Sequence, residues 1–234
     1  MLNEGDFMGK GLFITATGTD VGKTYVTALL VKKLRDAHLN AGYYKAALSG
    51  ALRQADGTLV PGDAAYVTEI AGLKASPESL VSYIYEEAVS PHLAALREGN
   101  PLEMEKVCAD YSAALKKYDY VTVEGSGGII CPIRWDERHI LLEDIIKALG
   151  LGTLVISNAA LGSINACALT VHYLKAKKIP VRGIILNNYD GADFMQRDNL
   201  KMMELLTGVP VLAAVAANAR EIDIDPAALC ALYK

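Results

Sequence analysis

The sequence predicts an α/β fold in which a doubly wound, mainly parallel sheet is flanked by helices. Strand-like and helix-like segments alternate along the 234 residues, and several strand-like segments are continuous apolar runs. Strands that are apolar on both faces are expected where helices cover both sides of a parallel sheet. Strands that alternate with helices at this spacing are typical of βαβ units. The chain therefore has the pattern of a layered sheet and not of a helical bundle.

Each expected element begins and ends at an ordinary sequence signal. The expected strands are apolar segments that end at small or polar residues, and they span residues 11–16, 42–48, 119–124, 152–157, 181–186 and 209–214. The expected helices, the first of which has apolar residues at helical spacing, span residues 23–38, 63–71, 101–117, 140–149, 163–177 and 193–206. Ser76-Pro77, Asn100-Pro101 and Asp225-Pro226 each predict a helix start, because proline suits the first helical position.

Composition limits the classes of function. No linker, repeat or low-complexity segment divides the chain, so we expect a single domain over residues 1–234. The net charge is −4 and no basic block is present, which argues against nucleic acid as a partner. No apolar run approaches the roughly 20 residues of a membrane span, and the polar, acidic residues 1–10 do not form a signal peptide. We expect a cytoplasmic protein without a membrane partner.

The four cysteines show no metal-binding or disulfide pattern. None belongs to a C-x-x-C pair, and each has apolar neighbours in the sequence. Small apolar surroundings are typical of buried thiols. We expect free, buried or half-buried side chains at Cys108, Cys131, Cys167 and Cys230.

The segment T-G-T-D-V-G-K-T at residues 17–24 predicts a phosphate-binding loop, or P-loop. It follows an apolar strand and opens a helix, so backbone N–H groups and the helix N-terminus can face an anion. In the usual pattern G-x-x-x-x-G-K-[ST], the lysine reaches the β- and γ-phosphates and the hydroxyl ligates Mg²⁺. Here Thr17 stands at the first glycine position and Gly18 follows it. The alternative is an ordinary strand-to-helix turn with an exposed Lys23.

Polar residues follow several of the expected strands, where open parallel sheets bind ligands. Lys45 and Ser49 lie at the end of the second strand, Glu124 ends the third, and Asn187 follows the fifth. Mg²⁺ prefers oxygen ligands, with one or two carboxylates beside the phosphates, so Glu124 is a candidate ligand. An acid at a helix start, as at Asp63, is also explained by the helix dipole. For Lys45, Asp63 and Asn187, the residues alone do not decide between a role in ligand binding and an ordinary position at a strand end, helix start or turn.

The motifs together resemble the dethiobiotin synthetase family. Over about residues 10–215 they occur in the order TGTDVGKT, YYKAALSG, GDAA, SPHLAALREGNPLE, VTVEGSGG, ALGSINACALT and GIILNN. The SPH, K-x-x-x-SG and VEG-x-GG segments are more specific than the phosphate loop. The resemblance implies an ATP-dependent ligase of P-loop fold. Such an enzyme converts 7,8-diaminopelargonic acid and CO₂ to a carbamate, phosphorylates it, and closes a ureido ring to give dethiobiotin, ADP and phosphate.

The resemblance also implies roles for individual residues. The residues implied to hold the nucleotide are Thr19, Asp20, Val21, Gly22, Lys23, Thr24 and, at the adenine, Asn187. The implied Mg²⁺ ligands are Thr24, Asp63 and Glu124, and the implied catalytic residues are Lys45 and Lys23. The implied substrate-binding residues are Ser49, Gly127, Gly128 and, reaching in from the partner subunit of a homodimer, Leu161, Gly162 and Asn165.

The chain departs from the family pattern at three places. The start of the phosphate loop is unusual at residues 16–18, Ala46 follows Lys45 where the family often has proline, and residues 215–218 supply no proline near the adenine. The last departure leaves the choice among ATP, CTP and GTP open.

Two other classes of protein fit the sequence less well than the ligase. A switch-type ATPase of the same broad fold would carry a second lysine early in the loop, where none is present. An amidotransferase-type synthetase acting on a large corrin would need an added glutaminase domain, for which 234 residues leave no room.

Overall fold

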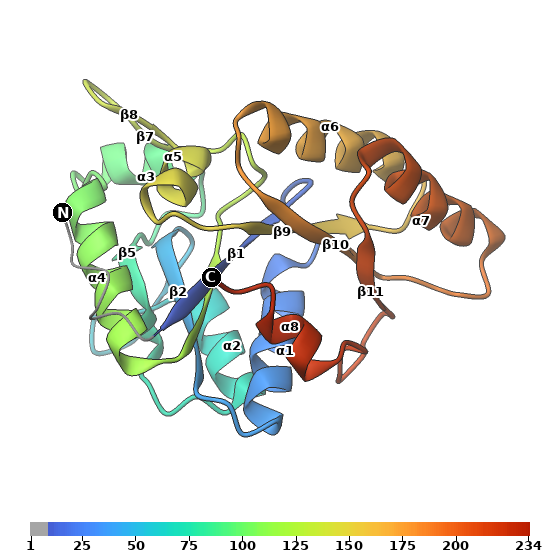
Figure 1. Ribbon diagram of the computed structural model, residues 1–234. Coiled ribbons are helices and arrows are strands. Elements are labelled where there is room, and N and C mark those ends of the chain that lie inside the picture. Colours follow the sequence, from blue (N-terminus) through green and yellow to red (C-terminus); the bar gives the residue numbers. More distant parts are fainter. Residues whose placement is uncertain (1–8) are drawn as a thin grey trace.

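The computed structural model describes residues 9–234 and contains a seven-stranded parallel sheet in the order β11-β10-β9-β1-β6-β2-β5 (Figure 1). The strands are β1 (Lys10–Ala16), β2 (Ala41–Leu48), β5 (Val81–Ile84), β6 (Tyr120–Glu124), β9 (Thr153–Asn158), β10 (Val181–Asn187) and β11 (Val211–Val215). On one side of β1 the strands β9, β10 and β11 follow in chain order, and on the other side β6 lies between β1 and the pair β2 and β5. Strands on both sides of β1 give the doubly wound sheet that the sequence predicts. Residues 1–8 of the expected domain and of the polar N-terminal segment lie outside the described residues.

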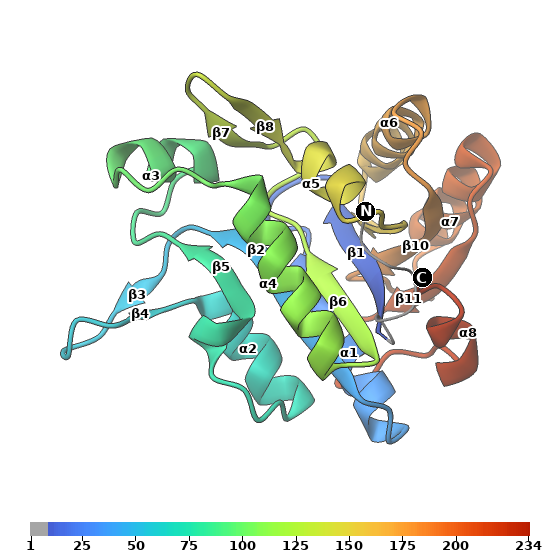
Figure 2. The same cartoon turned by 60° about the vertical axis from the view of Figure 1, so that its left-hand side comes forward.

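Helices cover both faces of the sheet (Figure 2). One face packs against α1 (Lys23–Asp36), α2 (Gly62–Ala71) and α8 (Pro226–Cys230). The other packs against α3 (Pro91–Arg97), α4 (Met104–Lys117), α5 (Leu142–Ala148), α6 (Ser163–Ala176) and α7 (Phe194–Thr207). Strand side chains alternate between the two cores: Leu12 and Ile14 join the first, and Phe13 joins the second. Burial on both faces explains why the strands are continuous apolar runs.

Several elements were not anticipated from the sequence. These are β5, α3, the hairpin of β3 (Leu52–Arg53) and β4 (Leu59–Val60), and the hairpin of β7 (Pro132–Trp135) and β8 (His139–Leu141). Ser76-Pro77 opens only a short 3₁₀ helix, η1 (Pro77–Leu80). The helix expected from residue 140 begins at Leu142, because His139–Leu141 pairs with β7.

The prediction that Pro101 opens a helix is wrong, because α4 begins at Met104. The preceding residues are held by contacts that a helical turn would break. The carbonyl of Asn100 accepts the Tyr85 hydroxyl at 2.8 Å, and the Glu103 N–H donates to the Tyr83 hydroxyl at 3.0 Å. Leu102 is fully buried between them. Tertiary contacts therefore override the local proline signal.

Two further expectations concern the whole chain. All four cysteines are free thiols, with Cys131 and Cys167 buried and Cys108 and Cys230 half-buried, which confirms the prediction. Within residues 9–234, no helix is long and apolar enough to cross a membrane.

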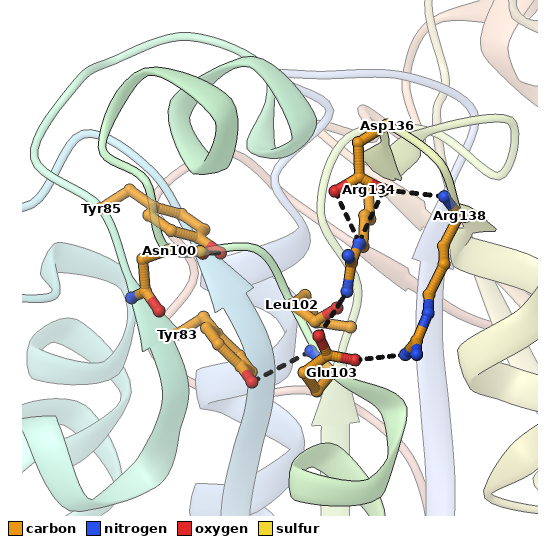
Figure 3. Close-up of polar contacts among 8 residues, drawn as sticks. All are labelled: Tyr83, Tyr85, Asn100, Leu102, Glu103, Arg134, Asp136 and Arg138. Carbon is orange, nitrogen blue, oxygen red and sulfur yellow. Dashed lines mark hydrogen bonds and ion pairs between the residues drawn. The ribbon is translucent and has the colours of Figure 1, made fainter.

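An ion-pair cluster fastens the β7–β8 hairpin to the segment before α4 (Figure 3). The Glu103 carboxylate lies between two guanidinium groups, 2.6 Å from Arg134 and 2.7 Å from Arg138. Arg134 also donates to Asp136 at 2.9 Å and to the carbonyl of Leu102 at 3.1 Å. The Arg134 side chain is only 11% exposed, whereas that of Arg138 is 63% exposed. Arg134 is thus the centre of the cluster and Arg138 its solvent-facing edge.

Arg134→Ala is expected to lower the urea midpoint of unfolding clearly more than Arg138→Ala. The first change removes contacts to two carboxylates and a carbonyl, and the second removes an exposed ion pair of small value. Equilibrium unfolding followed by circular dichroism measures the difference. Equal midpoints for the two variants would show that the cluster adds no more than surface charge pairing.

Candidate active site

The phosphate loop between β1 and α1 has the backbone conformation that its glycines allow. Gly22 is left-handed at φ 93°, and a Cβ there would lie 2.1 Å from Nδ2 of Asn187. No side chain caps the N-terminus of α1, so its first N–H groups remain available to an anion. The Lys23 ammonium donates to the carbonyl of Gly18 at 3.1 Å. The loop is therefore shaped around a point where phosphate oxygens can sit.

Four side chains from four elements meet beside this loop. Lys45 on β2 lies opposite Glu124 on β6 in the strand register. The Lys45 ammonium contacts Glu124 Oε1 at 2.8 Å and Asp63 Oδ2, from the first turn of α2, at 2.5 Å. The Thr24 hydroxyl of α1 donates to the same Glu124 Oε1 at 2.8 Å. The residues expected around the metal and the reacting centre are thus brought together.

The charges in this cluster shift one another's pKa values. Burial alone lowers the pKa of Lys45, but the attraction of Glu124 and Asp63 is stronger, and the net result is a raised pKa. Burial raises the pKa of Asp63, but Lys45, Thr24 and Lys23 together outweigh burial, so the net result is a lowered pKa. Burial, followed by repulsion from Lys45, lowers the pKa of Lys23. Lys45 stays charged between two carboxylates, and Lys23 is the cation that a polyanion would stabilise.

A cavity of about 1000 Å³ joins the loop to the ends of β2 and β6. The expected site residues that line it are Thr19, Asp20, Gly22, Lys23, Thr24, Lys45, Ser49, Asp63, Glu124 and Gly127. Gly128 approaches the loop from the side, since a Cβ there would lie 3.5 Å from Cα of Gly18. Leu161, Gly162 and Asn165 are exposed around the start of α6 and do not line this cavity.

Asn187 ends β10 behind the loop and is almost fully buried. Its Nδ2 donates to the carbonyl of Val21 at 3.0 Å, which fixes the orientation of the amide. Its Oδ1 is buried and has no hydrogen-bond partner among residues 9–234. A buried acceptor of this kind is costly unless something donates to it. Asn187 therefore offers an unused acceptor next to the phosphate loop.

Some cavity residues were missed by sequence reasoning. The segment Ala88–Pro91, whose last residue begins α3, and the loop residue Cys131 line the cavity. Ser90 and Pro91 belong to the SPH segment of the family resemblance, but no role in the site was assigned to them. Ser126 was passed over within the glycine-rich turn, and its hydroxyl donates to the carbonyl of Ala47 at 2.7 Å. Tyr43 donates to Glu124 Oε2 at 3.0 Å. Strand alternation would have revealed Tyr43, because it lies two residues before Lys45 and on the same face.

The donor set fits a hard cation that is shared with a phosphate. Among residues 9–234, no group of three or more His, Cys, Asp or Glu side chains could hold a metal by itself. Thr24, Asp63 and Glu124 supply one hydroxyl and two carboxylates around a single point. Mg²⁺ in nucleotide enzymes uses such a partial set and completes it with phosphate oxygens and water.

The fold, the phosphate loop and the adjoining carboxylates define a P-loop nucleotide-binding protein. A family model described as an AAA domain matches residues 10–221. The chain is 50% identical over 219 residues to an ATP-dependent dethiobiotin synthetase of Clostridium botulinum strain Loch Maree, covering 93% of this chain and 96% of the relative. An enzyme of the same name from strain 657 is 50% identical over 97% of this chain and 99% of the relative. The chain belongs to the ATP-dependent dethiobiotin synthetase family.

Solved structures of other proteins share the fold. The MinC:MinD cell division complex of Aquifex aeolicus has a TM-score of 0.57 at 15% identity, covering 91% of this chain and 83% of that one. A ParA family ATPase from Chlorobium tepidum has a TM-score of 0.52 at 15% identity, covering 88% of this chain and 83% of that one. At this identity the likeness concerns architecture alone.

Gly22→Ala is expected to destabilise the protein by about 1–3 kcal/mol, from left-handed strain and the contact with Asn187. Gly18→Ala is the matched control in the same loop. Its φ is not left-handed, and the nearest atom to an added Cβ is 3.8 Å away. Thermal unfolding without nucleotide measures both variants. Equal melting temperatures for the two variants would contradict the assigned backbone constraint.

Proposed function

We propose that this chain carboxylates 7,8-diaminopelargonic acid with CO₂ and closes the ureido ring of dethiobiotin at the expense of ATP. The observation that carries the proposal is the meeting of Lys45, Thr24, Asp63 and Glu124 beside a phosphate loop, in a cavity of about 1000 Å³. A cluster of this kind suits transfer of a γ-phosphoryl group to a carbamate, because such transfer depends on positioning and charge neutralisation. The family relationship supports the same reaction.

The chemistry requires three changes of bonding. An amine of the substrate attacks CO₂ and loses a proton, which gives a carbamate. A carbamate oxygen then attacks the γ-phosphorus of ATP, and ADP leaves. The second amine attacks the carbonyl carbon of the mixed anhydride, phosphate leaves, and the ring closes. A carbamate is a poor electrophile, so phosphorylation supplies the leaving group that ring closure needs.

The side chains of the cavity have distinct roles in this proposal. Lys45, held at the inner end of the cavity, lies between carbamate and γ-phosphate, where its charge offsets the charge that develops on the transferred group. Lys23 and the loop residues Thr19–Thr24 hold the phosphates. Ser49, Gly127 and Gly128 bind the diamine or carbamate.

Magnesium is proposed as the ion of the site. Thr24, Asp63 and Glu124 would hold it with phosphate oxygens of the nucleotide. When bound, the ion neutralises negative charge on the phosphates.

A homodimer and a cytoplasmic location complete the proposal. Leu161, Gly162 and Asn165 would bind the carboxylate tail of the diamine in the cavity of the partner subunit. Their exposure on the surface of their own chain leaves them free for that contact.

One assay tests the proposed reaction. The protein is incubated with ATP, Mg²⁺, bicarbonate and diaminopelargonic acid, and ADP and dethiobiotin are quantified with and without the diamine. Diamine-dependent ADP release with one dethiobiotin per ADP is expected. ADP release that ignores the diamine, with no dethiobiotin formed, would overturn the proposal.

Lys45→Ala should leave ADP binding close to that of the unaltered protein but reduce ring closure by on the order of 10²-fold or more, because the proposed contact is with the reacting centre. Steady-state kinetics and calorimetric ADP binding separate the two effects. Lys32→Ala, a change of a lysine outside the cavity on α1, serves as the control and should keep full turnover. Unchanged turnover in Lys45→Ala would show that Lys45 has no part in the chemistry.

The unused Oδ1 of Asn187 predicts a preference for bases whose amino group is at C6 of a purine or at C4 of a pyrimidine, as in adenine and cytosine. ATP should therefore exceed ITP, which carries an oxo group at C6 and a hydrogen on N1, by about tenfold or more in kcat/KM. Initial rates with ATP, ITP, CTP and GTP measure this preference. CTP should be used about as well as ATP, and GTP about as poorly as ITP. In Asn187→Ala the ratio of ATP to ITP should approach one. Equal use of ATP and ITP by the unaltered chain would contradict the assignment of Asn187 to the base.

A further inference from the structure

Tyr43 is a fully buried tyrosine that sequence reasoning did not connect with the site. It lies on β2 two residues before Lys45, so both side chains are on the same face of the sheet. Its ring belongs to the core between the sheet and α1, and its hydroxyl donates to Glu124 Oε2 at 3.0 Å. The hydroxyl therefore reaches the carboxylate from the protein interior, on the side away from the cavity.

The two oxygens of Glu124 have separate partners. Oε1 accepts from the Thr24 hydroxyl and from the Lys45 ammonium, both at 2.8 Å. Oε2 accepts from Tyr43. The Glu124 side chain is 0% exposed, so solvent cannot replace a partner that is lost. The division of partners fixes the rotation of the carboxylate and directs Oε1 at Thr24 and Lys45.

The Tyr43 hydroxyl has a single proton, and Glu124 Oε2 is the acceptor to which it donates. A phenylalanine would fill the same space and leave Oε2 without a donor.

We propose that Tyr43 is a positioning residue that turns Glu124 Oε1 toward the magnesium–nucleotide complex, a role that rests on the proposed function. Mg²⁺ requires near-octahedral geometry, so the direction of each ligand oxygen matters for its affinity. Partners that orient metal ligands typically contribute 10–100-fold to metal affinity or activity. Tyr43 would act through Glu124 and make no contact with the ion or the substrate.

The direct test compares Tyr43→Phe with the unaltered protein. ADP binding is measured by calorimetry during a MgCl₂ titration and again in EDTA. The Mg²⁺ concentration at half-maximal effect should rise about tenfold or more in Tyr43→Phe. Binding of ADP in EDTA should not change, because the phosphate loop is untouched. A Mg²⁺ titration that overlays that of the unaltered protein would overturn the proposal.

Tyr233→Phe is the matched control. Tyr233 is also buried, and its hydroxyl pairs at 2.6 Å with Thr122, which lies two residues before Glu124 on the same strand. Tyr233→Phe removes a buried hydroxyl that contacts β6 and leaves the partners of the Glu124 carboxylate unchanged. The Mg²⁺ dependence of this variant should stay unchanged. If the Mg²⁺ concentration at half-maximal effect rises equally in Tyr43→Phe and Tyr233→Phe, the effect comes from a general loosening of β6. That result would overturn the proposal.

A double-mutant cycle tests whether Tyr43 acts through Glu124. Glu124→Gln should itself raise the Mg²⁺ concentration at half-maximal effect. Adding Tyr43→Phe to Glu124→Gln should raise this concentration no further. Additive effects of the two changes would overturn the proposal. If Tyr43→Phe does not fold, Tyr43→Met supplies a side chain of adaptable shape without a hydroxyl.

The test also separates this role from the proposed reaction. If the unaltered protein makes dethiobiotin and binds ADP in a Mg²⁺-dependent manner while Tyr43→Phe behaves identically, only the role of Tyr43 is overturned. If ADP binding by the unaltered protein does not respond to Mg²⁺, the proposed metal site itself is wrong, and the role of Tyr43 is overturned with it.

Discussion

The carboxylate of Glu124 has no exposure to solvent, and contacts from two neighbouring elements converge on it. Thr24 reaches it from α1, Lys45 and Tyr43 reach it from β2, and Lys45 connects it further to Asp63 on α2. A buried negative charge is tolerated only when it is paired and hydrogen-bonded. The relative positions of the central strands and the two covering helices are therefore tied to one charged group. A shift of any of these elements would leave part of that charge without compensation.

This arrangement also explains how the site can exist before any nucleotide arrives. The carboxylates of Asp63 and Glu124, which we propose as Mg²⁺ ligands, would repel each other in the absence of a cation. The Lys45 ammonium lies between them and supplies the opposing charge. The phosphate loop is likewise held by internal contacts, from Lys23 to the carbonyl of Gly18 and from Asn187 to that of Val21. Binding energy then need not be used to order the site, which favours preorganised catalysis.

The parts of the fold that could be predicted from the sequence are those encoded locally. Apolar runs located the central strands, and the Gly-Lys-Thr step located the phosphate loop, because both depend on neighbouring residues. The predicted start of α4 at Pro101 was wrong because the hydroxyl groups of Tyr83 and Tyr85 hold the chain near Pro101 in a non-helical conformation. These two tyrosines are distant from Pro101 in the sequence. Strand ends indicated Lys45 and Glu124, but their distance from Asp63 depends on how α2 packs. Tyr43 was overlooked because an aromatic residue in an apolar strand usually indicates packing alone.

Asn187 connects the phosphate loop with the proposed binding site of the base. One end of its planar amide holds the backbone of the phosphate loop, and the other carries the acceptor proposed for the base. The separation between these two atoms is set by covalent geometry and does not vary with the ligand. If the acceptor reads the base, one side chain holds both the loop for the phosphates and the acceptor for the base in a fixed relation. Inorganic phosphate would then contact the loop alone, and a free nucleoside would contact the acceptor alone.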